Sequence, residues 1–170
     1  ADHSVSMSKD GTYFFDSYST IDTPPVALVR RSDTGATVKE IARADISRLK
    51  AKGWVPPTAF TVKARDGKTD LYGQMFKPTN FDPSKKYPLV VLLHGGPHTM
   101  WRDTYFLRWN YHLIAAPGYV VLLTNYTGST GFGEGFSQGI EGDPFQGPAD
   151  EINQAADVAI QLNGARGYSK

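Results

Sequence analysis

Residues 87–97 read Tyr-Pro-Leu-Val-Val-Leu-Leu-His-Gly-Gly-Pro, and this stretch decides the fold. A continuous apolar run that stops at two glycines is typical of a strand buried on both faces of a sheet. Residues 119–124, Tyr-Val-Val-Leu-Leu-Thr, form a second run of the same kind. Residues 101–116 lie between the two runs and have apolar residues at helical spacing. The order strand, helix, strand predicts a parallel β-α-β unit.

The sequence on either side of this unit extends the α/β pattern. Asp66-Gly67 lies between two strand-like segments, residues 60–64 and 69–76, and predicts a β-hairpin. Residues 132–140 and 149–162 have the spacing of helices. We therefore expect a domain of class α/β in residues 51–170, with a parallel sheet and helices packed on it.

Residues 1–50 differ from the rest because they carry short β segments that end at turn signals. The expected strands are followed by a short helix that Asp45 caps, and Pro56-Pro57 marks a linker. Three short strands do not form a stable independent sheet, so this region is expected to belong to a larger β assembly. The expected strands are residues 12–17, 26–30 and 37–41.

Composition narrows the classes of partner. The 170 residues include 18 basic and 17 acidic side chains without a Lys/Arg cluster, so no nucleic-acid partner is expected. The longest apolar run, residues 89–93, is too short to span a membrane, and no membrane partner is expected. The chain has no cysteine, which excludes disulfides and thiolate zinc sites. The compartment stays open, with a periplasmic or secreted location favoured by a small margin over a cytoplasmic one.

The tetrapeptide His-Gly-Gly-Pro at residues 94–97 is the first candidate for chemistry. It directly follows a buried strand, where α/β-hydrolases place a loop that supplies one backbone N–H to the oxyanion hole. Glycine suits this position because a side chain would obstruct the approach of the amide to the oxygen of a tetrahedral intermediate. A tight strand-to-helix turn without catalytic meaning explains the two glycines equally well. The candidate oxyanion-hole residues are Gly96, Gly95 and His94.

Further motifs around this loop resemble the prolyl oligopeptidase family of serine peptidases, in particular its acylaminoacyl-peptidase and dipeptidyl-peptidase 5-like branch. Residues 60–162 are similar to the N-terminal half of the α/β-hydrolase domain, and residues 8–14 to the last blade of the β-propeller that precedes it. Family members often carry Arg where Thr127 stands, and Trp-Gly-Gly where residues 144–147 stand. The motifs are residues 94–97, Trp101, residues 108–110, 118–119 and 125–133, and Gly142-Asp143.

The resemblance implies a serine exopeptidase that releases dipeptides or acylated residues from short peptides by acyl transfer, without a cofactor or metal. Gly96 aligns with the glycine whose N–H joins the oxyanion hole. His94 stands where some relatives have a tyrosine hydroxyl, and we favour a packing role for it over a polarising one. The nucleophile is expected on the strand after the helix that ends near residue 162. We therefore expect a fragment, cut at both ends, that lacks the Ser/Asp/His triad and is inactive alone.

Ser137 is a false candidate for the nucleophile. Residues 135–139, Gly-Phe-Ser-Gln-Gly, match the G-x-S-x-G pattern of hydrolase nucleophiles. The pattern requires a strand that runs directly into the serine, whereas Ser137 is expected inside a helix. The histidine of an α/β-hydrolase also follows its serine, and each histidine of this chain precedes Ser137.

Other clusters have simpler explanations. His94 and His98 are four residues apart, but the intervening Gly-Gly-Pro prevents a helix that could bring them to one metal. A loop followed by a helix N-terminus explains the acidic residues better than a catalytic pair. A core-facing helix stripe explains the aromatic residues better than a stacking platform. The acidic residues are Asp143, Asp150 and Glu151, and the aromatic residues are Trp101, Tyr105 and Trp109.

Two other functions stay open. An esterase or lipase shares the glycine loop and the sheet, but small esterases lack strands like those expected in residues 1–50. A non-catalytic interaction module is the other alternative, because a sheet that lacks its neighbouring strands has an unpaired edge. Such an edge favours a homo-oligomer.

Overall fold

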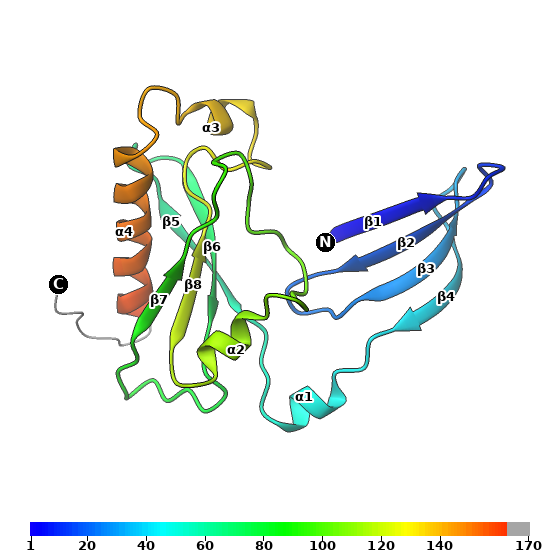
Figure 1. Cartoon of the computed structure of the whole chain (residues 1–170), viewed down its shortest axis with the longest axis horizontal. Coiled ribbons are helices and arrows are strands. Elements are labelled where there is room, and N and C mark those ends of the chain that lie inside the picture. The colour runs from blue at the N-terminus through cyan, green and yellow to red at the C-terminus, as the bar shows by residue number, and fades with distance from the viewer. Residues whose placement is uncertain (163–170) are drawn as a thin grey trace. The chain divides into compact units, whose positions relative to one another are not determined.

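The computed structural model describes residues 1–162, and these residues form two compact units (Figure 1). The first unit consists of residues 1–56 and 102–109, and the second of the remaining described residues. The sequence analysis divided the chain after residue 50, and no sequence signal joined residues 102–109 to the first unit. The nucleophile strand was expected after the helix that ends near residue 162, and residues 163–170 lie outside the described part.

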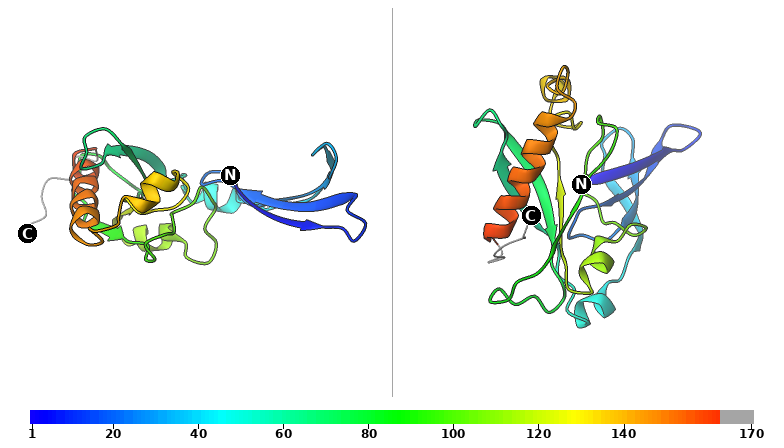
Figure 2. Two further views of the ribbon diagram at one scale, coloured as in Figure 1. Left: turned by 90° about the horizontal axis from the view of Figure 1, so that it is seen from above. Right: turned by 60° about the vertical axis from the view of Figure 1, so that its left-hand side comes forward.

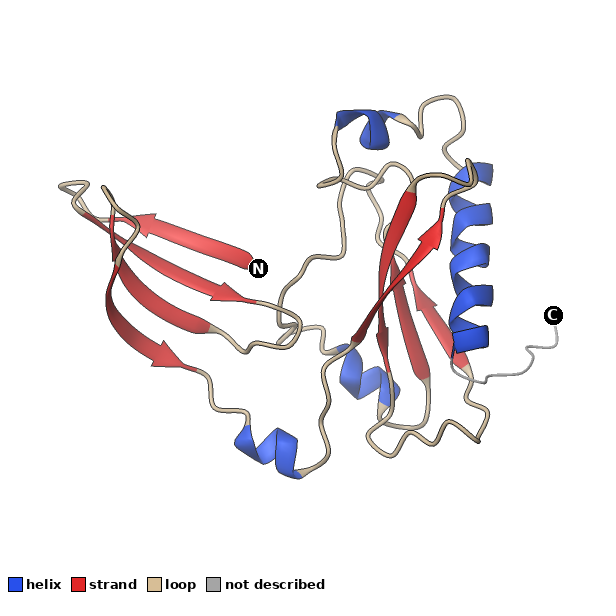
Figure 3. Cartoon of the chain, turned by 180° about the vertical axis from the view of Figure 1, so that it is seen from behind, coloured by secondary structure: helices blue, strands red, loops and turns tan. Residues whose placement is uncertain are grey.

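The first unit is an antiparallel sheet in the order β1-β2-β3-β4 (Figure 3). Three of its strands were predicted from the sequence. The prediction missed the first strand, whose sequence Asp-His-Ser-Val-Ser-Met lacks aromatic residues and is mostly exposed. This strand forms because it pairs with its neighbour along its whole length, a contact that local propensity does not encode. The strands are β1 (Asp2–Met7), β2 (Tyr13–Ser19), β3 (Val26–Arg31) and β4 (Thr37–Arg43).

A short helix, α1 (Ser47–Ala51), follows β4, and its predicted cap was wrong by one residue. Ile46, not Asp45, occupies the cap position, and its side chain makes no capping bond. The Asp45 carboxylate accepts a hydrogen bond from the Ser47 backbone N–H at 2.8 Å instead. Residues 102–109 join this unit through contacts such as the Tyr105 backbone N–H, which donates to Ser19 Oγ at 3.0 Å.

A buried carboxylate connects three strands of this sheet. Asp16 on β2 is 2% exposed, and its two oxygens contact His3 Nδ1 on β1 and Arg30 Nε on β3, each at 2.8 Å. Burial raises the pKa of Asp16, but the hydrogen bonds from His3 and Arg30 outweigh it, so the pKa of this carboxyl lies below its ordinary value. The ionised form is therefore the one that stabilises the folded sheet.

We predict that Asp16→Asn lowers the free energy of unfolding of the first unit by about 1–2 kcal/mol at pH 7, because hydrogen bonds to a charged group are lost while both partners stay partly exposed. A carboxyl with a lowered folded-state pKa stabilises above its unfolded pKa, and this stabilisation disappears as the pH falls through the folded value. Urea unfolding at pH 7 and pH 3 should therefore show a difference from the wild type that shrinks in acid.

Asp33→Asn is the control for this prediction. Asp33 forms an ion pair with Arg31 in the same unit, but both side chains are exposed, so its loss should change stability little. An Asp16→Asn protein that is as stable as the Asp33→Asn protein at pH 7 contradicts the prediction.

The second unit contains a mixed sheet in the order β5-β6-β8-β7. The Asp66-Gly67 hairpin is confirmed, because β5 pairs antiparallel with β6. The parallel pairing is confirmed for β7 and β8. The sheet as a whole is mixed, because the hairpin joins β8 in antiparallel orientation. The strands are β5 (Thr58–Lys63), β6 (Asp70–Phe76), β7 (Leu89–Leu92) and β8 (Val120–Thr124).

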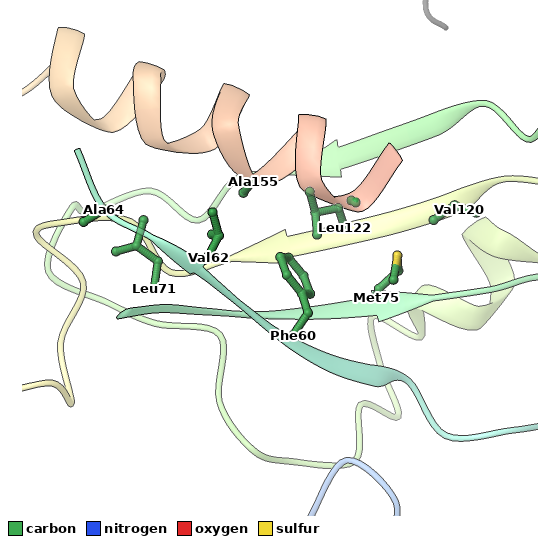
Figure 4. Close-up of a cluster of buried hydrophobic side chains, with 9 residues drawn as sticks. Phe60, Val62, Ala64, Leu71, Met75, Val120, Leu122 and Ala155 are labelled. Carbon is green, nitrogen blue, oxygen red and sulfur yellow. The ribbon is translucent and has the colours of Figure 1, made fainter. Parts of the chain in front are cut away.

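The helix α4 (Gln146–Leu162) lies along one face of this sheet (Figure 2). It begins three residues before its predicted start at residue 149. Ala155 and Ala159 are at most 1% exposed and let the helix backbone approach the strands closely. Figure 4 shows Ala155 above apolar side chains that come from three strands. These include Phe60 and Val62 of β5, Leu71 and Met75 of β6, and Val120 and Leu122 of β8.

The long helix predicted at residues 101–116 was wrong. Only α2 (Tyr111–Ala115) is helical, because the Asn110 side chain accepts a hydrogen bond from the His112 N–H and caps the helix there. The predicted aromatic stripe therefore does not exist, and Trp109 is 70% exposed. The predicted helix at residues 132–140 is confirmed in the shorter form α3 (Glu134–Gln138).

Candidate functional site

The candidate site is the loop of residues 94–101, which begins at the carboxyl end of β7. Gly96 has a φ of +132°, a conformation that a residue with a side chain rarely adopts, and an added Cβ would lie 3.1 Å from the His98 backbone N. An added Cβ at Gly95 would meet no atom within 4 Å. Both glycines are exposed. The backbone therefore requires glycine at residue 96 and tolerates other residues at residue 95.

The His94 side chain points into the protein and is 8% exposed. Its Nε2 lies 2.8 Å from Ser129 Oγ, and its ring stacks on Tyr126 with centroids 4.5 Å apart. The Tyr126 hydroxyl donates to the His94 carbonyl oxygen at 2.6 Å. Two residues that follow β8 therefore hold both the ring and the backbone of His94.

The hydrogen bonds of Ser129 determine which nitrogen of His94 carries a proton. Ser129 Oγ donates its one proton to the Tyr126 carbonyl oxygen at 2.7 Å, so in its contact with His94 it accepts. His94 Nε2 is therefore protonated and donates to Ser129. Burial lowers the pKa of His94, and the contact that opposes this effect, Nδ1 with the Gly95 carbonyl oxygen, is long at 3.3 Å. The neutral Nε2–H form follows, and its N–H is directed to Ser129.

This geometry favours the packing role of His94 over the polarising role. A donor to an oxyanion needs a free N–H that points toward the developing charge. The N–H of His94 already has an acceptor inside the protein. The oxyanion-hole assignment of the three candidates stays a prediction, and within it Gly96 has the strongest geometric support.

The segment of residues 125–130, which follows β8, holds the candidate loop at three further points. The Asn125 side chain accepts from the Trp101 backbone N–H at 2.8 Å and donates to the Trp101 carbonyl oxygen at 3.2 Å. His98 Nδ1 donates to the Gly128 carbonyl oxygen at 3.1 Å. The Thr130 N–H donates to the Thr99 carbonyl oxygen at 2.9 Å. The segment 125–130 thus fixes both ends of the candidate loop.

Gly128 allows this segment to pass close to the Ile140 side chain. It has a φ of +103°, and an added Cβ would lie 2.7 Å from Ile140 Cδ1. Residues 125–133 contain three glycines, and glycine is favoured wherever a turn or a close approach leaves no room for a side chain. At Gly128 the reason is both the turn conformation and this close contact.

No serine next to these histidines has the geometry of a nucleophile among the described residues. Ser137 lies within α3, and its Oγ donates to the Ser129 carbonyl oxygen at 3.1 Å. Ser129 contacts His94 at the distance of a nucleophile–base pair, but it is 0% exposed and its proton is bound to Tyr126. A substrate therefore cannot reach Ser129, and Ser137 does not follow a strand.

The structure also separates the other clusters singled out in the sequence. Among residues 1–162 no three His, Asp or Glu side chains are placed to hold a metal ion. Asp143 pairs with Arg65 and accepts hydrogen bonds from the Gln146 and Gly147 N–H groups, each at 3.1 Å. These bonds, that from Gly147 first, lower the pKa of Asp143. Asp143 therefore stabilises the start of α4, as interpreted from the sequence.

A cavity of about 400 Å³ borders the candidate loop. Its lining includes His94, Tyr126, Phe145 and Ile152. Phe145 is 83% exposed, which leaves a large apolar side chain in water next to the cavity. None of the helices in residues 1–162 has the length and apolar character that crossing a membrane requires.

Comparisons with known proteins agree on one family. Residues 105–166 match the model of the prolyl oligopeptidase family. The chain is 38% identical over 115 residues to dipeptidyl-peptidase 5 of Aspergillus fumigatus, a match that covers 68% of this chain and 16% of that protein. It is 44% identical over 85 residues to dipeptidyl-peptidase 4 of Giardia intestinalis, covering 50% of this chain and 11% of that protein.

A solved structure extends the similarity over almost the whole chain. The dipeptidyl peptidase 4 of Porphyromonas gingivalis matches with a TM-score of 0.79 and 26% identity, and the match covers 96% of this chain and 24% of that one. The chain thus spans less than a quarter of the length of these relatives. The resemblance found in the sequence is confirmed, and the chain belongs to the prolyl oligopeptidase family.

Proposed function

We propose that the chain is part of a serine exopeptidase that removes dipeptides or acylated residues from short peptides. The family match and the names of the curated relatives, which are dipeptidyl peptidases, support a peptidase. Because the chain spans only 16% of the Aspergillus protein, the activity is proposed for a longer protein that contains these residues.

The observation that carries this proposal is the place and shape of the candidate loop. Gly96 lies just beyond the carboxyl end of a parallel strand, where ligands bind in open α/β sheets. Its exposed backbone has a conformation that requires glycine, and residues 125–130 hold the loop on both sides. A rigid, exposed backbone amide at this place suits a donor to an oxyanion, because preorganised donors stabilise developing charge without reorganisation.

In the proposed reaction a serine hydroxyl attacks the scissile carbonyl carbon, and a histidine takes the proton of that hydroxyl. An aspartate orients the histidine, which then gives the proton to the leaving amine. The carbonyl oxygen becomes negative and accepts hydrogen bonds from the Gly96 N–H and from the amide after the serine. Water then attacks the acyl-enzyme and releases the second product. Within residues 1–162, Gly96 is the group to which we assign a part in this reaction.

The two sheets fit the domains that such a peptidase needs. We propose that β5 to β8 with α4 form the first half of an α/β-hydrolase domain, and that β1 to β4 form the last blade of a β-propeller. Successive residues of a strand face opposite sides of a sheet. Val5 pairs with Asp16 and is 55% exposed, whereas Phe15 faces the other side and is 41% exposed. Apolar side chains on both faces suit a sheet stacked between others, which small esterases lack.

We predict that the 170-residue chain is not labelled by a fluorophosphonate probe and does not hydrolyse dipeptidyl substrates, because neither Ser129 nor Ser137 has nucleophile geometry. Intact mass spectrometry before and after labelling checks this, with the longer natural protein as the positive control. Ser137→Ala should behave like the unmodified chain. A stoichiometric label on Ser137 would contradict the conclusion that Ser137 is not the nucleophile.

Gly96 allows a sharper test in the longer protein that contains these residues. Gly96→Ala should lower kcat by about 10²–10³-fold, the effect of losing one oxyanion donor, because a side chain forces the backbone away from a φ of +132°. Gly95→Ala is the matched control and should keep most of the activity, since its Cβ would meet open space. Equal losses in the two variants contradict the role of Gly96.

A further inference from the structure

Helix α4 carries a buried acid for which the proposed reaction has no use. Glu151 is 1% exposed. Its Oε2 accepts the Thr127 backbone N–H at 2.8 Å, and its Oε1 accepts the Thr127 hydroxyl at 2.9 Å. A carboxylate that is removed from water needs such partners, because its burial is otherwise very unfavourable. A single residue of the loop after β8 supplies both donors.

The position of Glu151 is set by the helix. Ala155, one turn further along α4, is 0% exposed and packs against the sheet, so Glu151 lies on the helix face that is directed to the strands. The nearby cation is Arg65, which pairs with Asp143. Asp143 chiefly raises the pKa of Arg65, and Glu151 and Asp150 add to this effect. Glu151 thus joins α4 to the loop after β8, and the positive charge of Arg65 partly compensates the negative charge of Glu151.

Thr127 stands in the middle of the segment that holds the candidate loop. The residues on one side of it, Asn125 and Tyr126, bind Trp101 and His94. The residues on the other side, Gly128 and Ser129, bind His98 and His94. A displacement of Thr127 therefore displaces contacts at both ends of residues 94–101.

The Thr127 side chain also lies close to the backbone at the end of α3. An added Cβ at Gly139 would lie 3.0 Å from Thr127 Cγ2, so the chain after α3 leaves little room there. A second cavity, of about 450 Å³, is lined by Thr127, Glu151 and Arg65, whereas His94 and Tyr126 line the first one. Thr127 and Glu151 thus line a different cavity from His94.

We propose that Glu151 and Thr127 are a positioning pair that sets the conformation of residues 94–101 through the segment 125–130. Neither residue touches the reacting atoms. The pair acts by fixing Thr127, which places the acceptors and donors that hold Trp101 and His94. This proposal rests on the proposed function only because that function assigns a catalytic part to Gly96, which lies in the positioned loop. The coupling between Thr127 and residues 94–101 is a property of the folded chain and does not depend on that function.

The test follows two signals of the candidate loop by NMR in the 170-residue chain. One is the hydrogen-exchange rate of the Trp101 amide, which is bound to Asn125. The other is the Nε2–H resonance of His94. In Glu151→Gln and Thr127→Val we expect the Trp101 amide to exchange about tenfold faster or more, because a buried partner is lost. The His94 resonance should shift, while the amides of β8 keep their exchange rates.

Two control variants separate positioning from general stability. Asp150→Asn removes the exposed acid next to Glu151 and should leave both signals unchanged. Thr127→Ser keeps the hydroxyl and should restore most of the wild-type behaviour that Thr127→Val loses. Thr127→Val retains size and branching, so it keeps the test valid even if the Glu151 variant does not fold.

Two results would overturn the proposal. In the first, the Trp101 exchange rate and the His94 resonance stay unchanged in the folded variants. In the second, the Trp101 and β8 amides accelerate together, which indicates a loss of global stability only. Neither readout needs catalysis, so a failure of Gly96 as an oxyanion donor leaves the result on Glu151 intact and can be distinguished from it.

Discussion

The hydrogen bonds between the segment after β8 and the loop after β7 are the constraint on which the candidate site depends. The two strands are parallel and adjacent, so their carboxyl ends meet at one edge of the sheet and the two loops lie side by side. Backbone groups of loops have no ladder partners and need other ones. Asn125 supplies them at Trp101, and Tyr126 supplies them at His94. The shape of residues 94–101 is therefore determined by residues 24–35 positions later in the sequence.

The same contacts decide what each polar group is free to do. Ser129 donates its hydroxyl proton to the Tyr126 carbonyl oxygen and accepts a hydrogen bond from His94 Nε2. This Ser–His pair of the described chain is therefore a structural contact. His94, buried and neutral, directs its N–H inward. The loop thus presents its glycine backbone outward and keeps its imidazole inside. A fixed amide of this kind suits electrostatic catalysis better than a side chain that has to reorganise.

The sequence predicted the features that depend on local pattern. The hairpin at Asp66-Gly67, the strands at residues 89–92 and 120–124 and the last helix follow from turn residues and from periodicity. The helix predicted from residue 101 does not begin there: the Asn125 side chain, distant in sequence, binds the Trp101 backbone, and the helix begins only after the Asn110 cap. Propensity contains no information about such a partner.

The residues of the candidate site differ in the same way: some are signalled by local sequence pattern, and others depend on contacts that are distant in sequence. Gly96 was identifiable because its motif directly follows a strand, and the family resemblance gave it a role. Ser129 and Glu151 were not recognised, since a lone serine or glutamate has no periodicity or spacing that signals a buried contact. Glu151 was grouped with Asp143 and Asp150 as an ordinary helix N-terminus. That interpretation fits Asp143, whereas Glu151 is buried and binds Thr127.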